Sequence, residues 1–105
     1  GEIVYILKET EEFAKWYDSF KNGTPKYAIT RRLKNLSVGL LGDYKNLKGN
    51  LFELRFFNKG LAGLRIYYTI KSNGEILLLL NGGNKSSQQE DIKKARELII
   101  KYKEV

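Results

Sequence analysis

Two segments in the second half of the chain alternate apolar and polar side chains, and this pattern restricts the fold more than any other feature. Residues 51–57 and 62–71 both show it, and side chains at every second position of a β-strand lie on one face. Their apolar faces can therefore cover a core. Their opposite faces carry polar or charged side chains: Glu53, Arg55, Arg65, Tyr67 and Thr69. If the two strands pair, the first four of these side chains converge on one patch of a sheet.

Turn dipeptides predict where further strands lie. Gly49-Asn50 separates residues 43–48 from the first alternating segment, and Asn73-Gly74, the stronger hairpin signal, separates the second from residues 75–80. Apart from its first residue, this last segment is apolar on both faces, as in a strand covered on both sides near the middle of a sheet. We expect the chain to leave the strand through Asn81-Gly82-Gly83.

The first part of the chain predicts a short strand and two helices. Residues 3–7 are rich in β-branched and aromatic types and indicate the strand. Thr10 suits the N-cap of a first helix, and Asn22-Gly23 followed by Thr24-Pro25 ends that helix and begins a second. An aromatic stripe follows Thr10 at helical spacing: Phe13, Trp16, Tyr17 and Phe20. We interpret the stripe as core packing against the sheet rather than as a nucleic-acid platform.

The second predicted helix is basic, and a third helix follows the strands. The basic residues of the second helix are Lys26, Arg31, Arg32 and Lys34. A solvated face is the usual interpretation of such residues. The alternatives are a surface that extends a nucleic-acid footprint and one that binds an acidic segment of a partner. Ser87 with Glu90 forms a capping box for the last helix, whose apolar stripe is Ile92, Ala95, Ile99 and Tyr102. Residues 1–105 are thus expected to form one α+β domain with an antiparallel sheet of about four to five strands.

Composition narrows the chemistry. Lysine and arginine total 19 against 12 acidic residues, and the net charge of +7 favours a polyanionic partner, with nucleic acid first, although a merely soluble basic domain remains an alternative. The chain has no cysteine and no histidine, so catalysis would use Lys, Arg, Tyr, Asp or Glu. No apolar stretch approaches the roughly 20 residues of a membrane helix. We expect a cytoplasmic protein without a metal or cofactor.

The charged patch suits phosphate chemistry on RNA. Guanidinium groups bind phosphate and stabilise the charge that develops during in-line displacement, while the neighbouring 2′-hydroxyl is the nucleophile. Lys45, Lys48 and Lys85 are expected to border the patch. Glu53 or a lysine would be the general base, and Tyr67 would stack a base or donate a proton. The alternative for Glu53 is an ion pair that orients Arg65. The alternative is a solvent-exposed sheet face with cross-strand Glu–Arg pairs, each worth roughly 0.2–1 kcal/mol.

Several short runs carry a family resemblance: Gly42-Asp43-Tyr44-Lys45, Phe52-Glu53-Leu54-Arg55, Gly63-Leu64-Arg65-Ile66-Tyr67-Tyr68, Leu77-Leu78-Leu79, and Gly82-Gly83-Asn84-Lys85-Ser86-Ser87-Gln88 followed by Asp91-Ile92. In order and spacing they resemble the HigB-like branch of RelE/ParE-superfamily toxins over nearly the whole chain. The resemblance implies a RelE-like fold with two N-terminal helices and one C-terminal helix. It also implies a type II toxin–antitoxin toxin inhibited by a cognate antitoxin, commonly a helix-turn-helix protein. Many members cleave mRNA on the ribosome and so block translation.

The same resemblance assigns roles by position. Arg55 matches a basic strand residue, Arg65 the arginine of a Gly-x-Arg-x-x-Tyr strand, and Lys85 a basic residue of the loop after the last strand. Two positions depart from the family, because Glu53 stands where RelE has a lysine and Asp91 lies near the place of a functional tyrosine. An antitoxin is expected to cover or distort the basic face. Two rival functions remain, a ParE-like DNA gyrase inhibitor and a non-catalytic relic that only binds its antitoxin.

Overall fold

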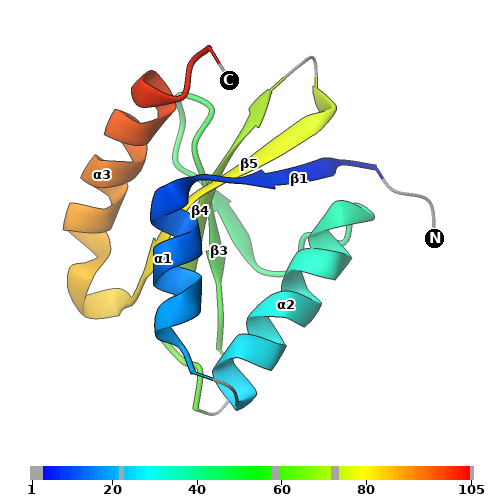
Figure 1. The fold of residues 1–105 in the computed structure, drawn as a ribbon, viewed down its shortest axis with the longest axis vertical. Coiled ribbons are helices and arrows are strands. Elements are labelled where there is room, and N and C mark those ends of the chain that lie inside the picture. The colour runs from blue at the N-terminus through cyan, green and yellow to red at the C-terminus, as the bar shows by residue number, and fades with distance from the viewer. Residues whose placement is uncertain (1–3, 22, 58–59, 72–73, 105) are drawn as a thin grey trace.

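The computed structural model describes residues 4–21, 23–57, 60–71 and 74–104 of the 105-residue chain. Asn22 and Asn73, which belong to two of the expected turns, and Ile3, the first residue of the expected first strand, lie outside the described residues. The described elements follow one another along the chain as β1 (Ile6–Glu9), α1 (Glu11–Ser19), α2 (Thr24–Ser37), β2 (Tyr44–Asn46), β3 (Phe52–Arg55), β4 (Arg65–Lys71), β5 (Ile76–Gly83), the 3-10 turn η2 (Lys85–Ser87) and α3 (Gln88–Lys101). The expected α+β class is confirmed, with two N-terminal helices and one C-terminal helix (Figure 1).

The described strands form one five-stranded sheet in the order β1-β5-β4-β3-β2. Strands β2, β3, β4 and β5 pair antiparallel with one another in sequence, as expected. β1 differs, because it runs parallel to β5 at the edge of the sheet, with Ile6 beside Ile76 and Glu9 beside Leu79. The sheet is therefore mixed. A crossover through α1, α2 and three strands separates β1 from β5, and such a long connection permits parallel pairing.

The first strand begins later than predicted, at Ile6 instead of residue 3. The backbone N–H groups of Val4 and Tyr5 both donate to the carbonyl of Ser37, at 2.8 and 3.0 Å. They therefore satisfy the end of α2 instead of joining the sheet. Pairing with β5 extends to Glu9. The N-cap of α1 is Thr10, as predicted, and its hydroxyl accepts a hydrogen bond from the Phe13 N–H at 2.9 Å.

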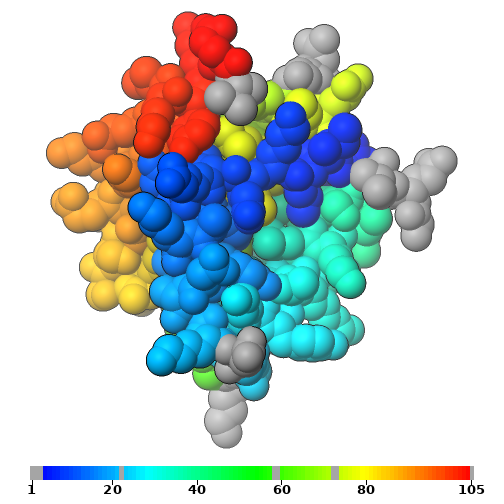
Figure 2. Space-filling view, in the orientation of Figure 1, coloured from blue at the N-terminus to red at the C-terminus, as the bar shows by residue number. Residues whose placement is uncertain are grey.

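Helices α1 and α2 cover one face of the sheet (Figures 1 and 2). The aromatic stripe of α1 packs into this core, as predicted, because Phe13 is buried and its three companions pack against the same cluster. The buried members of the cluster come from both helices, from the sheet and from the loop between β3 and β4: Phe13, Ile29, Leu36, Leu54, Phe56, Leu61, Ile66, Tyr68, Leu77 and Leu79. At this face Trp16 lies so close to Gly82 that a Cβ there would approach the indole within 2.5 Å.

Helix α3 covers the opposite face and forms a second core. Leu78 and Leu80 of β5 point into it, while Leu77 and Leu79 point into the first. The prediction of a strand covered on both faces is thus confirmed. Buried residues of the second core are Leu51, Tyr67, Leu78, Leu80, Ala95 and Leu98. No helix among the described residues has both the length and the apolar character needed to cross a membrane.

Two predictions around the end of β5 were wrong. The strand continues through Asn81, Gly82 and Gly83, because Gly82 pairs with Ile66 and Gly83 with Arg65. Glycine is needed at Gly83, where a Cβ would lie 1.8 Å from a carboxylate oxygen of Asp91. The capping box is also different: Ser87 is the N-cap residue of α3 but makes no side-chain cap bond there, and Asn84 with Ser87 forms a capping box on η2 instead.

The expectation that the basic residues of α2 form a solvated face was wrong for Arg32. Its guanidinium donates to the carbonyl of Arg55 at 2.8 Å, of Leu41 at 3.1 Å and of Asp43 at 2.7 Å. It also lies over the Phe56 ring. Arg32 is therefore an internal brace between α2 and the β2–β3 region, while other basic residues of the helix remain at the surface.

Candidate functional site

Strand pairing brings the predicted charged residues together. In the β3–β4 register Arg55 lies opposite Arg65, and Glu53 lies opposite Tyr67. Gly83 of β5 is the next partner of Arg65. Arg55, Arg65 and Gly83 therefore form one row across β3, β4 and β5 at the end of the sheet. The predicted convergence of Glu53, Arg55, Arg65 and Tyr67 is confirmed.

Glu53 is fully buried, with 0% of the residue exposed. Its Oε2 atom lies 3.6 Å from Nε of Arg65 and accepts a hydrogen bond from Nε2 of Gln88 at 2.9 Å. Gln88 begins α3, so this helix covers the row that the sequence predicted as an open face. The alternative of a solvent-exposed sheet face with weak surface pairs was therefore wrong at Glu53. The burial also prevents Glu53 from reaching an RNA 2′-hydroxyl in this structure.

Tyr67 is also fully buried, within the second core under α3. Burial and the neighbouring Glu53 carboxylate raise the pKa of the Tyr67 phenol. The ring offers no open surface to a nucleotide, so the expected stacking role does not fit this arrangement. The phenol instead lies beside Glu53, the cross-strand partner of Tyr67.

Arg65 is 9% exposed, and two contacts orient its guanidinium. One is the ion pair with Glu53, and the other is a hydrogen bond from a terminal nitrogen to the carbonyl of Gly63 at 2.9 Å. A buried carboxylate beside a guanidinium offsets the cost of removing the cation from water. Arg65 is thus held in one orientation at the margin of the α3 core.

Arg55 is more accessible than Arg65 and has different neighbours. Its Nε lies 3.5 Å from a carboxylate oxygen of Asp43, and its guanidinium lies 5.7 Å from the centre of the exposed Phe57 ring. Its backbone is fixed by Arg32 through the hydrogen bond to the Arg55 carbonyl. Arg55 therefore presents a cation at the surface from a braced strand.

Lys85 lies on the same side of the sheet end. It is exposed on η2, and a Cβ added to Gly63 would lie 3.6 Å from Cβ of Lys85. Because Gly63 also accepts the hydrogen bond of Arg65, it connects the lysine with the arginine row. We name Arg55, Arg65 and Lys85 the basic cluster. The side chain of Asn84 accepts from the N–H groups of Ser86 and Ser87, which orders the turn that carries Lys85.

The other two lysines predicted to border the patch, Lys45 and Lys48, lie at different distances from the basic cluster. Lys45 is exposed in β2 directly beside Glu53, one row from the arginine pair. Lys48 lies beyond the other end of β2, in a turn where both Lys48 and Asn50 have positive φ. Arg96 of α3 donates to the Lys48 carbonyl at 3.2 Å and helps to hold this turn. The structure thus does not bring Lys48 to the basic cluster.

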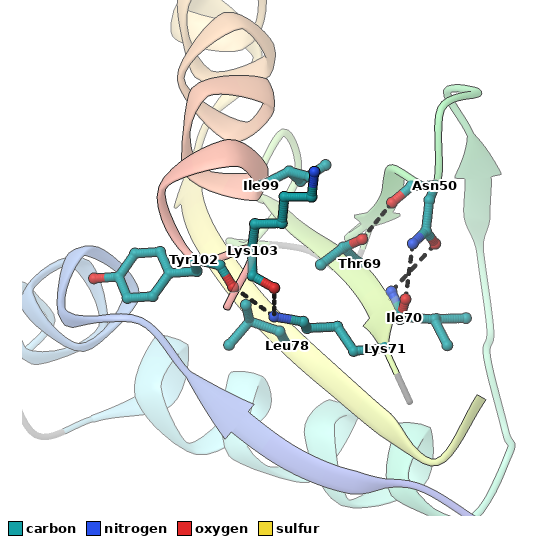
Figure 3. A pocket seen from close by; sticks show the side chains of 8 residues that line it. All are labelled: Asn50, Thr69, Ile70, Lys71, Leu78, Ile99, Tyr102 and Lys103. Carbon is teal, nitrogen blue, oxygen red and sulfur yellow. Dashed lines mark hydrogen bonds between the residues drawn. The ribbon is translucent and has the colours of Figure 1, made fainter. Parts of the chain in front are cut away.

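A hollow of about 250 Å³ opens at the far end of the α3 face (Figure 3). Figure 3 shows the ammonium of Lys71 bonded to the carbonyls of Tyr102 and Lys103, while Asn50 bonds the backbone of Ile70. The Lys71 bonds fix the C-terminal end of α3 against β4, and the Asn50 bonds fix the turn before β3 against the same strand. The hollow belongs to the packing of the second core and lies apart from the basic cluster.

Three residues of the site were not predicted from the sequence to contact the charged side chains. Gln88 binds Glu53, Asp43 pairs with Arg55, and Arg32 braces the Arg55 backbone. Gln88 and Asp43 belong to the runs that carry the family resemblance, which was the available signal. Arg32 gave no signal, because its position on a basic helix resembles that of a solvated side chain.

No family model matches the chain. Among solved structures, a mutant of the Escherichia coli toxin RelE in its free state superposes with a TM-score of 0.71 at 13% identity, over 92% of this chain and 99% of that one. RelE in the RelE–RelB complex of Pyrococcus horikoshii gives 0.60 at 13% identity, over 79% and 97%. The conserved hypothetical protein HP0892 of Helicobacter pylori gives 0.56 at 22% identity, over 80% and 98%. The chain therefore has the fold of RelE toxins, as the resemblance implied.

The sequence comparison gives the family itself. The chain is 40% identical over 92 residues to an uncharacterized protein of Haemophilus influenzae, covering 88% of this chain and 90% of that protein. It belongs to the same family as that protein. Assignment to the HigB-like branch stays a prediction.

Proposed function

We propose that the protein is the toxin of a type II toxin–antitoxin system and acts as an mRNA endonuclease at the ribosome, in the cytoplasm. The observation that carries this proposal is the basic cluster: Arg55 opposite Arg65, with Lys85 beside Gly63, on a RelE fold. These three cations at one sheet end, two of them beside the carboxylates of Asp43 and Glu53, complement the negative charge of a phosphodiester. The chain's net charge of +7 favours approach to RNA.

The basic cluster would bind the scissile phosphate and stabilise the charge of the transition state. In the proposed reaction the 2′-oxygen loses its proton and forms a bond to phosphorus. The bond from phosphorus to the 5′-oxygen breaks, and the 5′-oxygen takes a proton from water. The products are a 2′,3′-cyclic phosphate and a 5′-hydroxyl. The negative charge on the phosphoryl oxygens grows during this step, so guanidinium and ammonium groups beside them lower the barrier.

Burial favours the ion-pair role of Glu53 over that of a general base. Glu53 is a positioning residue, because its carboxylate holds Nε of Arg65 and does not face the surface. Lys45 is exposed one row from the arginine pair and is our candidate for accepting the proton of the 2′-hydroxyl.

We also propose a cognate antitoxin as partner. The similar structure from Pyrococcus horikoshii is a RelE–RelB complex, and that from Mycobacterium tuberculosis is the toxin–antitoxin complex RelBE2. The family resemblance favours a helix-turn-helix antitoxin for this chain. A reading frame for such a protein next to this gene supports the pairing, and co-purification of the two products tests it.

Expression in a bacterial host tests the proposed activity. The wild type is expected to stop growth and to produce new mRNA ends, while Lys85→Ala and Arg55→Ala lower the yield of those ends by about 100-fold, the usual effect of removing one transition-state contact. Lys93→Ala is the matched control, because this exposed lysine lies on α3 outside the cluster. Equal growth inhibition by all four proteins without new ends would overturn the mechanism. Induction of DNA-damage signalling would indicate a gyrase inhibitor, and absence of toxicity a relic.

A further inference from the structure

The outer face of α2 has features that neither the fold nor the basic cluster explains. Its exposed residues recur at helical spacing along one stripe: Thr24, Tyr27, Arg31, Lys34 and Asn35. Tyr27 is 70% exposed, which is unusual for a large aromatic side chain in the middle of a helix. The helix contains no acidic residue. Basic and aromatic character is therefore concentrated on this stripe.

Tyr27 forms part of the wall of three separate hollows. Their volumes are about 350, 280 and 180 Å³. The hollow of about 280 Å³ has apolar walls from Ala28, Phe56 and Leu61 and a cationic rim at Arg31. A cavity of about 150 Å³ accommodates benzene. This hollow therefore has the size and lining to accept an apolar side chain beside an ion pair.

Two of the four cations of α2 already have partners within the chain. Lys26 lies 3.6 Å from the Asp18 carboxylate and over the Tyr17 ring. Arg32 is committed to backbone carbonyls, as described above. Arg31 and Lys34 remain as exposed cations on the stripe, three residues apart.

We propose that this stripe, centred on Tyr27 and Arg31, is a docking surface for an acidic amphipathic helix of a protein partner. Two exposed cations suit a pair of carboxylates on one helical face, and apolar side chains of the same helix fill the hollows beside Tyr27. Tyrosine and arginine are also the residue types that dominate binding energy at protein interfaces. A nucleic acid would need a longer row of available cations along its backbone.

The docking surface lies on the other side of the sheet from Glu53 and Gln88, which orient Arg65, whereas Arg32 of α2 holds the Arg55 backbone. α2 packs on the core that contains Leu54 and Ile66, whereas Glu53 and Tyr67 face α3. A partner bound to the outer face of α2 therefore leaves Arg65 and Lys85 uncovered, in contrast to the expectation that an antitoxin covers the basic face. Naming the partner as the antitoxin rests on the proposed function, but the docking surface does not.

Selection from a phage library of 20-residue helical peptides tests the surface. Peptides enriched on the wild-type protein are expected to carry Asp or Glu beside apolar residues at helical spacing. Tyr27→Ser and Arg31→Glu should each weaken their binding at least tenfold. Matched controls on α3 are Ile100→Ser, at a residue 75% exposed, and Lys94→Glu, and these should bind like the wild type. Circular dichroism melting verifies that each variant is folded.

A 20-nucleotide single-stranded RNA, measured by fluorescence polarisation, provides the opposing arm. Loss of RNA affinity in Tyr27→Ser and Arg31→Glu with unchanged peptide binding would overturn the proposal in favour of an RNA surface. Peptides that bind all variants equally, or a selection that enriches no acidic peptide, would also overturn it. Lys85→Ala should retain full peptide binding, so a failure of the proposed nuclease function leaves this test intact.

Discussion

Glu53 and Arg65 form a buried ion pair across β3 and β4, with Oε2 of the glutamate 3.6 Å from Nε of the arginine. Glu53 is the fully buried partner, and Arg65 lies at the margin of the core. Gln88 adds a hydrogen bond from α3. The pair thus connects the core beneath α3 with the basic cluster, and it orients the guanidinium that we propose to meet the phosphate.

Removing one member of this pair should be costly. Glu53→Ala leaves a largely buried cation without its partner, so we expect the free energy of unfolding to fall by about 3–5 kcal/mol. Urea denaturation measures this loss. The double variant Glu53→Ala/Arg65→Ala should lose less than the sum of the two single variants, because both disrupt one interaction. A loss below about 1 kcal/mol for Glu53→Ala would contradict the assigned positioning role.

Arg32 and its neighbour Arg31 provide a matched comparison on α2. Arg32→Ala removes the donor for three backbone carbonyls, so we expect the free energy of unfolding to fall by about 2–4 kcal/mol. Arg31→Ala, at an exposed position, should change it by no more than about 0.5 kcal/mol. Thermal or urea denaturation of both variants measures the difference. Equal losses would show that the bonds of Arg32 add no stability.

The burial of Tyr67 should make the stability of the fold depend on pH at alkaline values. Its pKa in the folded protein is raised by burial and by Glu53, above the usual value of about 10. The folded state therefore favours the neutral phenol, and this stability is present below pH 10 and is lost as pH rises above it. Tyr67→Phe should unfold at a higher pH than the wild type. Tyr27→Phe is the exposed control and should behave like the wild type; an identical shift in both variants would refute the assignment.

The Glu12 carboxyl should make the stability of the fold depend on pH at acid values. The hydrogen bond from Lys101 lowers the pKa of the Glu12 carboxyl to about 2. A lowered pKa means that this link between α1 and α3 stabilises the fold above the unfolded-state pKa of the carboxyl and is lost as pH falls through about 2. Glu12→Gln should be less stable than the wild type at pH 6, and the difference should vanish near pH 2. Glu11→Gln, one residue earlier and exposed, is the control for urea titrations at both pH values.

The period of the strands made the central part of the fold predictable. Alternation in β3 and β4 placed Leu54 and Ile66 on one face and Arg55 and Arg65 on the other, and the register confirms it. The aromatic stripe of α1 was predictable for the same reason, because a helix must bury one apolar face. Local patterns therefore determined which side chains share a face.

Long-range contacts were not predictable from those patterns. Alternation shows which face Glu53 occupies, but only the docking of α3 through Gln88 determines that this face is buried. Likewise, Gly82 and Gly83 look like turn residues, yet they continue β5 because Trp16 and Asp91 pack directly onto them. The parallel pairing of β1 depends on a strand distant in sequence, so the segment itself carries no signal of its direction.

A reconstituted translation reaction measures directly whether the protein cleaves RNA at a phosphodiester that the basic cluster binds. Purified wild-type protein and Lys85→Ala are added to ribosomes translating a defined mRNA, and the 5′ ends and 3′-terminal groups of the fragments are mapped. We expect fragments with 2′,3′-cyclic phosphate ends for the wild type and about 100-fold fewer for Lys85→Ala. Intact mRNA with the wild type, or equal cleavage by both proteins, would contradict it.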